Sequence, residues 1–174
     1  MLKAIALGLA AGLTPLCALA DEVGQVTATL GGEERTWYAI SVKRGEETAS
    51  TASLKNSKRL SSLTIQAHPE PRFTTSDVLS LDADWFGLAA AGKAPTTVEI
   101  LYLPQGMSNP FYTTDQVETR PVMTFDTLAI DGETGQTTGS FTARLCRVAK
   151  LYEAPDTSDC LDLEGRFDTQ LRIR

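Results

Sequence analysis

The sequence has little of the chemistry on which most enzymes and metal sites depend. Its 174 residues include one histidine, His68, and three cysteines. His68 begins the segment 68–71, His-Pro-Glu-Pro, whose two prolines favour an extended or turn conformation. A catalytic triad would need this one histidine as its base, and a zinc site would have no second imidazole. We therefore interpret His68 as a loop residue without a catalytic task.

Motifs for nucleophilic, nucleotide and cofactor chemistry are absent as well. The nearest approach to a Gly-x-Ser-x-Gly elbow is residues 106–110, which end in Pro110 instead of glycine. The acidic segment 131–136 lacks the spacing of a calcium-binding EF-hand, and its Asp-Gly start is a strong turn signal. No phosphate-binding glycine loop, haem motif or flavin signature occurs. We expect no cofactor and no metal.

Paired carboxylates provide the enzymatic alternative. Asp82 and Asp84 lie two residues apart and would share one face of a strand. Two carboxylates can hydrolyse a glycosidic bond. The chain has 22 acidic residues, however, so pairs at this spacing are expected on solvated strands in any case. A carbohydrate-active hydrolase using Asp82 and Asp84 is therefore an alternative and not the main prediction.

Long apolar runs are also missing. The longest covers residues 4–13, about half of the roughly 20 residues needed to cross a membrane. It follows Lys3 and precedes Pro15 and the small residues Ala18 and Ala20, which is the order of a secretory signal. We expect residues 1–20 to be a cleaved signal peptide and residues 21–174 to form one periplasmic or secreted domain, with no transmembrane segment. A membrane anchor or a lipoprotein modified at Cys17 is less favoured.

The charge balance is acidic, with a formal net charge of −6. Nucleic-acid binding depends on a basic patch that neutralises phosphates, so we expect no nucleic-acid partner. For the same reason the overall charge makes an anionic membrane surface a poor candidate partner. The simplest consequence of the charge is solubility.

Strand signals dominate the part of the chain after residue 20. Short segments rich in β-branched and aromatic residues, several of them alternating apolar and polar residues, are separated by Gly, Pro, Asn and Asp. This pattern predicts an all-β domain, an antiparallel β-sandwich, with a β-barrel as the alternative. Residues 76–91 fit a strand through Asp84 with a short helical turn near Leu88. The other expected strands are residues 23–30, 36–42, 60–67, 98–103, 122–130, 137–148 and 161–173.

Two polar segments, residues 43–58 and 104–121, are expected to be long loops, which in a compact domain are either mobile or functional. The strand pattern also predicts which side chains face the core. Trp37 and Phe86 are expected to be buried. The other predicted core residues are Leu63, Ile65, Ile100, Phe125, Phe141, Leu145, Leu163, Phe167, Leu171 and Ile173.

Cys146 and Cys160 are the two cysteines that remain once the signal peptide has gone. An even number of cysteines in an exported domain predicts a disulfide. If the two cysteines face each other across an antiparallel pair, opposed residue numbers have the constant sum 306. Phe141 then faces Gly165, Gly139 faces Phe167, and Arg144 faces Asp162. Each phenylalanine would cover the other strand's glycine. Both cysteines would point outward, and residues 147–159 would connect the strands.

The segment 104–121 also carries the candidate contact residues. Phe111, Tyr112 and Met107 stand among proline, glycine and asparagine, where an apolar side chain is expected on the surface. Exposed aromatic side chains favour partner binding. We therefore predict a ligand or partner site at these three residues.

The closing segments 139–145 and 165–171 both read Gly-x-Phe-x-[Ala/Thr]-x-Leu. Together with the glycine turn at 31–32 before Trp37, this resembles small exported bacterial β-sandwich domains of unknown function. The resemblance implies the fold and export, and it brings no catalytic residues. We expect a non-catalytic binding or accessory module of the bacterial envelope, acting on an unknown protein or small molecule. An enzyme inhibitor or a structural envelope subunit is the further alternative.

Overall fold

The computed structural model describes residues 20–108 and 110–174, and within these ranges it contains eleven strands and no helix. The prediction of an all-β domain is confirmed. The proposed signal peptide lies, except for Ala20, outside the described residues. The strands are β1 (Ala20–Leu30), β2 (Glu33–Arg44), β3 (Glu47–Ser50), β4 (Ala52–Lys55), β5 (Leu60–Ala67), β6 (Val78–Phe86), β7 (Thr97–Leu103), β8 (Phe111–Thr113), β9 (Val122–Asp131), β10 (Thr134–Val148) and β11 (Asp156–Ile173).

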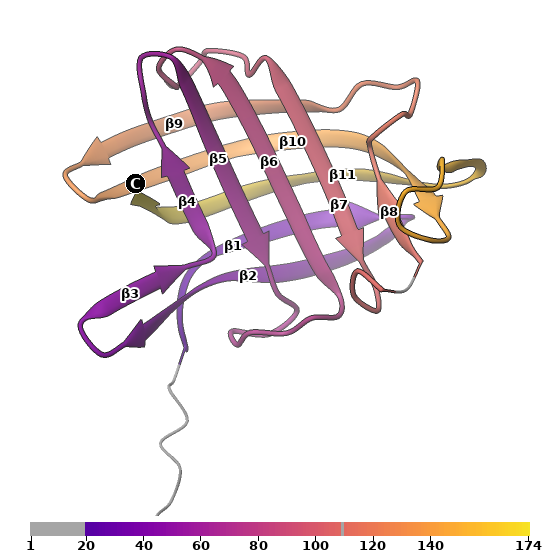
Figure 1. Cartoon of the computed structure of the whole chain (residues 1–174), viewed down its shortest axis with the longest axis horizontal. Helices are drawn as coiled ribbons and strands as arrows, with labels where there is room; N and C mark the ends of the chain where they lie inside the picture. Colours follow the sequence, from indigo (N-terminus) through magenta and orange to yellow (C-terminus); the bar gives the residue numbers. More distant parts are fainter. Residues whose placement is uncertain (1–19, 109) are drawn as a thin grey trace, which may run out of the picture.

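The strands form one continuous sheet that closes on itself. Its order is β3-β2-β1-β11-β4-β5-β6-β7-β8-β10-β9, and β10 also pairs with β11. The β4–β11 pair, Ser53 with Arg172 and Leu54 with Ile173, is parallel, whereas the other pairs are antiparallel. In Figure 1, β5, β6 and β7 lie in front and cross over β1, β2, β10 and β11 behind them. No segment of the described part of the chain is a helix that could cross a membrane.

The main core lies between these crossing strands. Nine of the ten side chains predicted for it are buried, and Ile173 packs against it partly buried. Trp37 is buried as predicted. Phe86 is not: it is 73% exposed, because alternation along β6 turns Trp85 inward and Phe86 outward. The prediction for Phe86 followed its hydrophobicity and was wrong.

The predicted register of β10 and β11 is confirmed. Cys146 pairs with Cys160, Arg144 with Asp162, and Phe141 with Gly165. The register then shifts, and Arg147 pairs with Asp156. The connection is therefore shorter than predicted, since β10 continues to Val148 and β11 already begins at Asp156.

The two predicted loops both contain strands. Residues 43–58 include β3 and β4, which pair with β2 and with β5 and β11. Residues 104–121 include β8, which pairs with β7 and β10. The helical turn predicted near Leu88 is also absent, because β6 stays extended to Phe86 and residues 87–96 form an irregular loop with a turn.

Candidate functional site

A second, smaller apolar cluster lies on the outer face of the sheet. Along β7, Ile100 and Tyr102 belong to the main core, whereas the alternate residues Leu101 and Leu103 point the other way. With Leu101 at its edge, this outer cluster consists of Val78, Leu103, Phe111 and Val148. An apolar cluster outside the main core has to be covered by loops or by a partner to be shielded from water.

A groove of about 400 Å³ lies over this cluster. Buried Phe111 forms part of its lining, and the exposed side chains Met107, Leu151 and Tyr152 stand around it. Tyr152 is 97% exposed and has a φ of 70°, a left-handed conformation that is uncommon for tyrosine. The full lining is Glu99, Leu101, Met107, Phe111, Thr113, Asp115, Gln116, Val148, Leu151, Tyr152, Glu153 and Pro155.

The charged side chains of the groove are all acidic. Glu99, Asp115 and Glu153 line it, and no lysine or arginine does. The pKa of Glu99 is raised, first because neighbouring residues remove part of its hydration and then because Asp82, Asp115 and Asp84 repel its charge. A cation in the groove would relieve this repulsion. The groove is thus suited to a ligand with an apolar part and a positive charge.

The three predicted contact residues divide between the two faces of the sheet. Met107 and Phe111 line the groove. Tyr112 follows Phe111 along β8 and points to the opposite face, where its ring lies 6.3 Å from that of Tyr102. The Tyr112 hydroxyl donates a hydrogen bond of 3.4 Å to Asp159. Phe111 is buried and belongs to a strand, so its expected place in an exposed loop was wrong.

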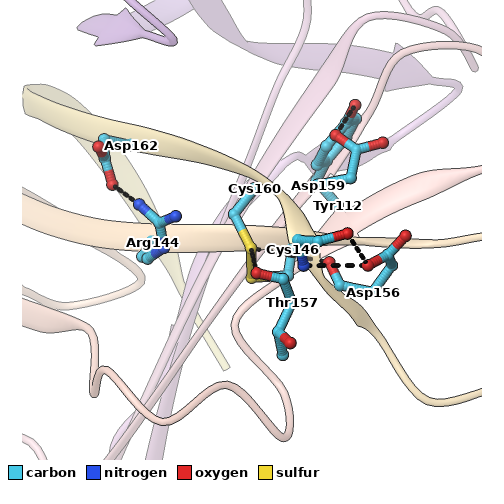
Figure 2. Close-up of a disulfide and its surroundings, with 9 residues drawn as sticks. Tyr112, Arg144, Cys146, Asp156, Thr157, Asp159, Cys160 and Asp162 are labelled. Carbon is cyan, nitrogen blue, oxygen red and sulfur yellow. Dashed lines mark hydrogen bonds and ion pairs between the residues drawn. A yellow bond between two sulfur atoms is a disulfide. The ribbon is translucent and has the colours of Figure 1, made fainter.

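The disulfide Cys146–Cys160 joins the strands at the base of the connection that carries Leu151 and Tyr152. Figure 2 shows this bond beside the Arg144–Asp162 ion pair, whose nitrogen and oxygen lie 2.8 Å apart. Cys146 has the outward direction predicted for it but is 1% exposed. The disulfide limits how far the ends of this connection can separate.

The alternative pair Asp82 and Asp84 lies on the outer face of β6. The Asp82 carboxylate accepts hydrogen bonds from the hydroxyls of Thr64, at 2.6 Å, and Ser80, at 2.9 Å. Asp84 pairs across the ladders with Ser62 and Thr97. Neither carboxylate lines the groove. Among the described residues, no group of three His, Cys, Asp or Glu side chains is arranged to hold a metal ion.

His68 lies just after the end of β5, outside the named strands, and its side chain is buried. Its backbone exchanges two hydrogen bonds with Tyr38, of 2.7 and 2.9 Å, which connects β2 to the end of β5. The Nδ1 atom accepts a hydrogen bond of 3.2 Å from the Thr74 backbone N–H, and Nε2 has no partner. Burial lowers the pKa of His68.

Sequence reasoning did not identify Glu99, Leu151 or Tyr152 as parts of the site. They come from β7 and from the β10–β11 connection, which meet Met107 and Phe111 only in the folded sheet. Their one sequence signal is that Leu151 and Tyr152 are apolar residues within a polar connection.

No family model matches the chain, and no curated protein and no solved structure does either.

Proposed function

We propose that this chain is an exported, non-catalytic binding module with a β-sandwich fold, and that the groove beside Met107 is its binding site. The observation that carries the proposal is the outer apolar cluster with a groove above it. Exposed Met107, Leu151 and Tyr152 surround this groove, and its only charges are negative. A partner segment with an apolar side chain and a neighbouring lysine or arginine would match both features.

Export is supported by the order of charged, apolar and small residues at the start of the sequence and by the disulfide, since disulfides persist in oxidising compartments. The resemblance to small exported bacterial domains agrees with a periplasmic or secreted module of the cell envelope. The crossing of β5–β7 over β1, β2, β10 and β11 places two layers face to face, as in a sandwich, although both layers belong to one closed sheet.

The hydrolase alternative has weaker support. Asp82 already accepts two hydrogen bonds from neighbouring side chains, and neither Asp82 nor Asp84 lines the groove. A glycosidase needs both carboxyl groups beside a cleft that holds the substrate. Turnover that disappears with Asp84→Asn would favour the enzyme over the binding module.

The methionines provide a direct test of binding. Residues 21–174 contain two of them, Met107 at the groove and Met123 in the main core. In methyl NMR spectra of the protein, a capped peptide alternating lysine and phenylalanine should shift the Met107 signal and leave the Met123 signal in place. A peptide alternating glutamate and phenylalanine should shift neither. Equal shifts with both peptides, or none with the lysine peptide, would contradict the proposal.

Matched variants locate the site. Glu99→Gln should weaken lysine-peptide binding by up to about five-fold, as removal of one partly exposed charge does. Tyr152→Ser should weaken it as well. Phe86→Ser is the control, because Phe86 is also an exposed aromatic side chain but lies outside the groove. The same three variants, used as baits in a pull-down from detergent-solubilised envelope, in which no intact bilayer is present, then separate a groove-dependent partner from background.

A further inference from the structure

Two loops at one end of β5 and β6 form a surface whose charge is opposite in sign to the net charge of the chain. We call residues 55–60 and 86–96 the basic tip. In Figure 1 the β4–β5 and β6–β7 loops that belong to it lie at the top of the view. The tip is a separate surface from the groove beside Met107, and none of its residues lines that groove.

The charge of the tip is entirely positive. It carries Lys55, Lys58, Arg59 and Lys93, and no aspartate or glutamate occurs in residues 49–69 or 85–98. None of the ion pairs within the described part of the chain involves these four side chains. In a chain with 22 acidic residues and a net charge of −6, this clustering leaves a local positive surface.

Three large apolar side chains are exposed on the same tip. Phe86 and Leu60 lie directly opposite each other across the β5–β6 ladder and point outward, and Leu88 follows in the adjoining loop. Their exposed fractions are 73%, 48% and 50%. The nearest acidic residue along β6 is Asp84, which lies two residues before Phe86, about 7 Å away at the rise of a strand.

The tip is held in shape by hydrogen bonds between its two loops and within the second of them. The Gly87 N–H donates to the Arg59 carbonyl at 3.0 Å, and the Ala89 N–H donates to the Asn56 side chain, also at 3.0 Å. The Lys93 ammonium donates to the carbonyls of Phe86 and Leu88, at 3.1 and 2.7 Å. The exposed apolar side chains are therefore presented on an ordered scaffold and do not depend on a ligand to bring them together.

The indole of Trp85 ties this scaffold to the core. Its Nε1–H donates to the Lys93 carbonyl at 3.1 Å, and the Gly92 N–H donates to the Phe125 carbonyl of β9 at 2.9 Å. A Cβ at Gly87 would lie within 4 Å of both the Lys58 carbonyl and the Lys93 ammonium, so the two cationic segments adjoin.

We propose that the basic tip docks on the surface of an anionic phospholipid bilayer. Apolar side chains that enter the headgroup region, ringed by lysine and arginine, are the combination that interfacial binding requires. Each basic residue near an anionic leaflet strengthens binding about five-fold. The acidic net charge argues against membrane binding by the whole surface. Electrostatic interactions with the bilayer, however, fall off within a Debye length, so the local positive charge of the tip determines whether the tip is attracted.

The test is sedimentation of the natively exported protein with lipid vesicles. Vesicles of equal parts phosphatidylglycerol and phosphatidylcholine should bind it at least about tenfold better than phosphatidylcholine alone, because four cations take part. Added salt should weaken this binding. Lys58→Glu and Phe86→Ser should each lower it at least about five-fold.

Lys150→Glu and Tyr152→Ser are the matched controls, since they reverse one charge and remove one aromatic ring at exposed positions of the β10–β11 connection and should leave vesicle binding unchanged. The proposal is overturned if both vesicle types bind alike, if neither binds, or if the controls lower binding as much as the tip variants. It is also overturned if heparin displaces the vesicles and Phe86→Ser has no effect, because the partner is then a soluble polyanion. If the lysine peptide does not bind the groove, the vesicle result is unaffected, because the groove and the basic tip are separate surfaces.

Discussion

Phe141 lies over Gly165 across the β10–β11 ladder, so closely that a Cβ on Gly165 would come within 2.7 Å of the phenylalanine Cζ. The reciprocal pair is Phe167 over Gly139, where the corresponding distance is 2.5 Å. The two rings are nearly parallel, with centroids 6.4 Å apart. The ring of the opposite phenylalanine therefore fills the space beside each glycine, and neither position has room for a side chain.

Gly165→Ala should therefore destabilise the fold, by about 1–3 kcal/mol as is usual for overpacking. The added methyl group would also meet the Thr27 carbonyl oxygen, at 2.6 Å, so the backbone of β1 would have to move. Urea unfolding followed by circular dichroism measures the loss. Thr142→Ala, an exposed change beside Phe141, is the control and should cost under about 0.5 kcal/mol.

A double-mutant cycle measures how much of this cost is due to the ring of Phe141. In a Phe141→Leu background the cost of Gly165→Ala should be smaller, with a coupling energy of at least about 0.5 kcal/mol. Strict additivity of the two changes would show that Phe141 is not what excludes a side chain at Gly165.

Reduction of Cys146–Cys160 should lower the free energy of unfolding by about 3 kcal/mol, the value for a closed loop of about 15 residues. The reason is that the reduced unfolded chain gains conformational freedom. Urea midpoints with and without dithiothreitol measure the effect. The Cys146→Ala, Cys160→Ala double variant should show no response to the reductant, and two free thiols in the protein purified from its native host would contradict the bond.

Tyr102 sits in a polar network between β2 and β7. Its hydroxyl donates to the Asp77 carboxylate and accepts from the Arg35 guanidinium, both at 2.9 Å. Burial, and then the bond to Asp77, raises the pKa of Tyr102 to about 12. Because the neutral form is favoured in the fold, this group's contribution to stability is present below the ordinary pKa of 10 and is lost as pH rises towards 12.

A rapid pH jump read by tyrosinate absorbance should show a step near pH 12 before the chain unfolds. Tyr102→Phe should remove that step and cost about 1–3 kcal/mol at neutral pH, because hydrogen bonds to charged groups are lost. Tyr152→Phe should leave the step in place. A step near pH 12 that survives Tyr102→Phe would assign the shift to another tyrosine.

The parts of the fold that could be predicted are those in which several local signals agree. In β10 and β11 the cysteines, glycines, phenylalanines and the Arg144–Asp162 pair all favour one register, and the structure has it. The alternation in residues 60–67 predicted β5 with both of its ends correct. Such signals can be recognised in a sequence because the two-residue period of a strand appears in neighbouring residues.

The parts that could not be predicted depend on neighbours far away in the sequence. β4 is short, and it forms because it pairs with β5 and with the last residues of β11. Phe86 is a different case: it is large and apolar, but the alternation along β6, which places Trp85 inward, turns it outward. Only part of the groove could be predicted. Met107 and Phe111 belong to one segment of the sequence, whereas Glu99 and Tyr152 are brought to it by the sheet.

His68 should make the fold sensitive to acid. The Thr74 backbone N–H donates to Nδ1, so the proton of the neutral ring is on Nε2, which is buried without a partner. A second proton would break the bond from Thr74 and leave a charge with no counter-ion against the ring of Phe73, whose centroid lies 5.3 Å away. Burial lowers the pKa of His68 from 6.5 for this reason.

The direction of the pH effect follows from that shift. The unfolded chain takes up a proton near pH 6.5, whereas the folded chain takes it up only at lower pH. Stability contributed by neutral His68 is therefore fully present above pH 6.5 and is lost as pH falls below it, by at most about 1.4 kcal/mol per pH unit for one proton. Urea midpoints between about pH 5 and 7 should show this decline.

His68→Asn tests the assignment, because its side-chain oxygen can accept the bond from Thr74 but does not titrate. The decline between pH 5 and 7 should disappear in this variant. Glu99→Gln is the control variant. The pKa of Glu99 is raised from 4.5, so its titration adds stability as the pH falls and opposes the loss caused by His68 at the acid end of the range. The NMR signal of the histidine ring is unambiguous because the chain has one histidine. A ring that titrates in the folded protein at or above 6.5 would refute the prediction.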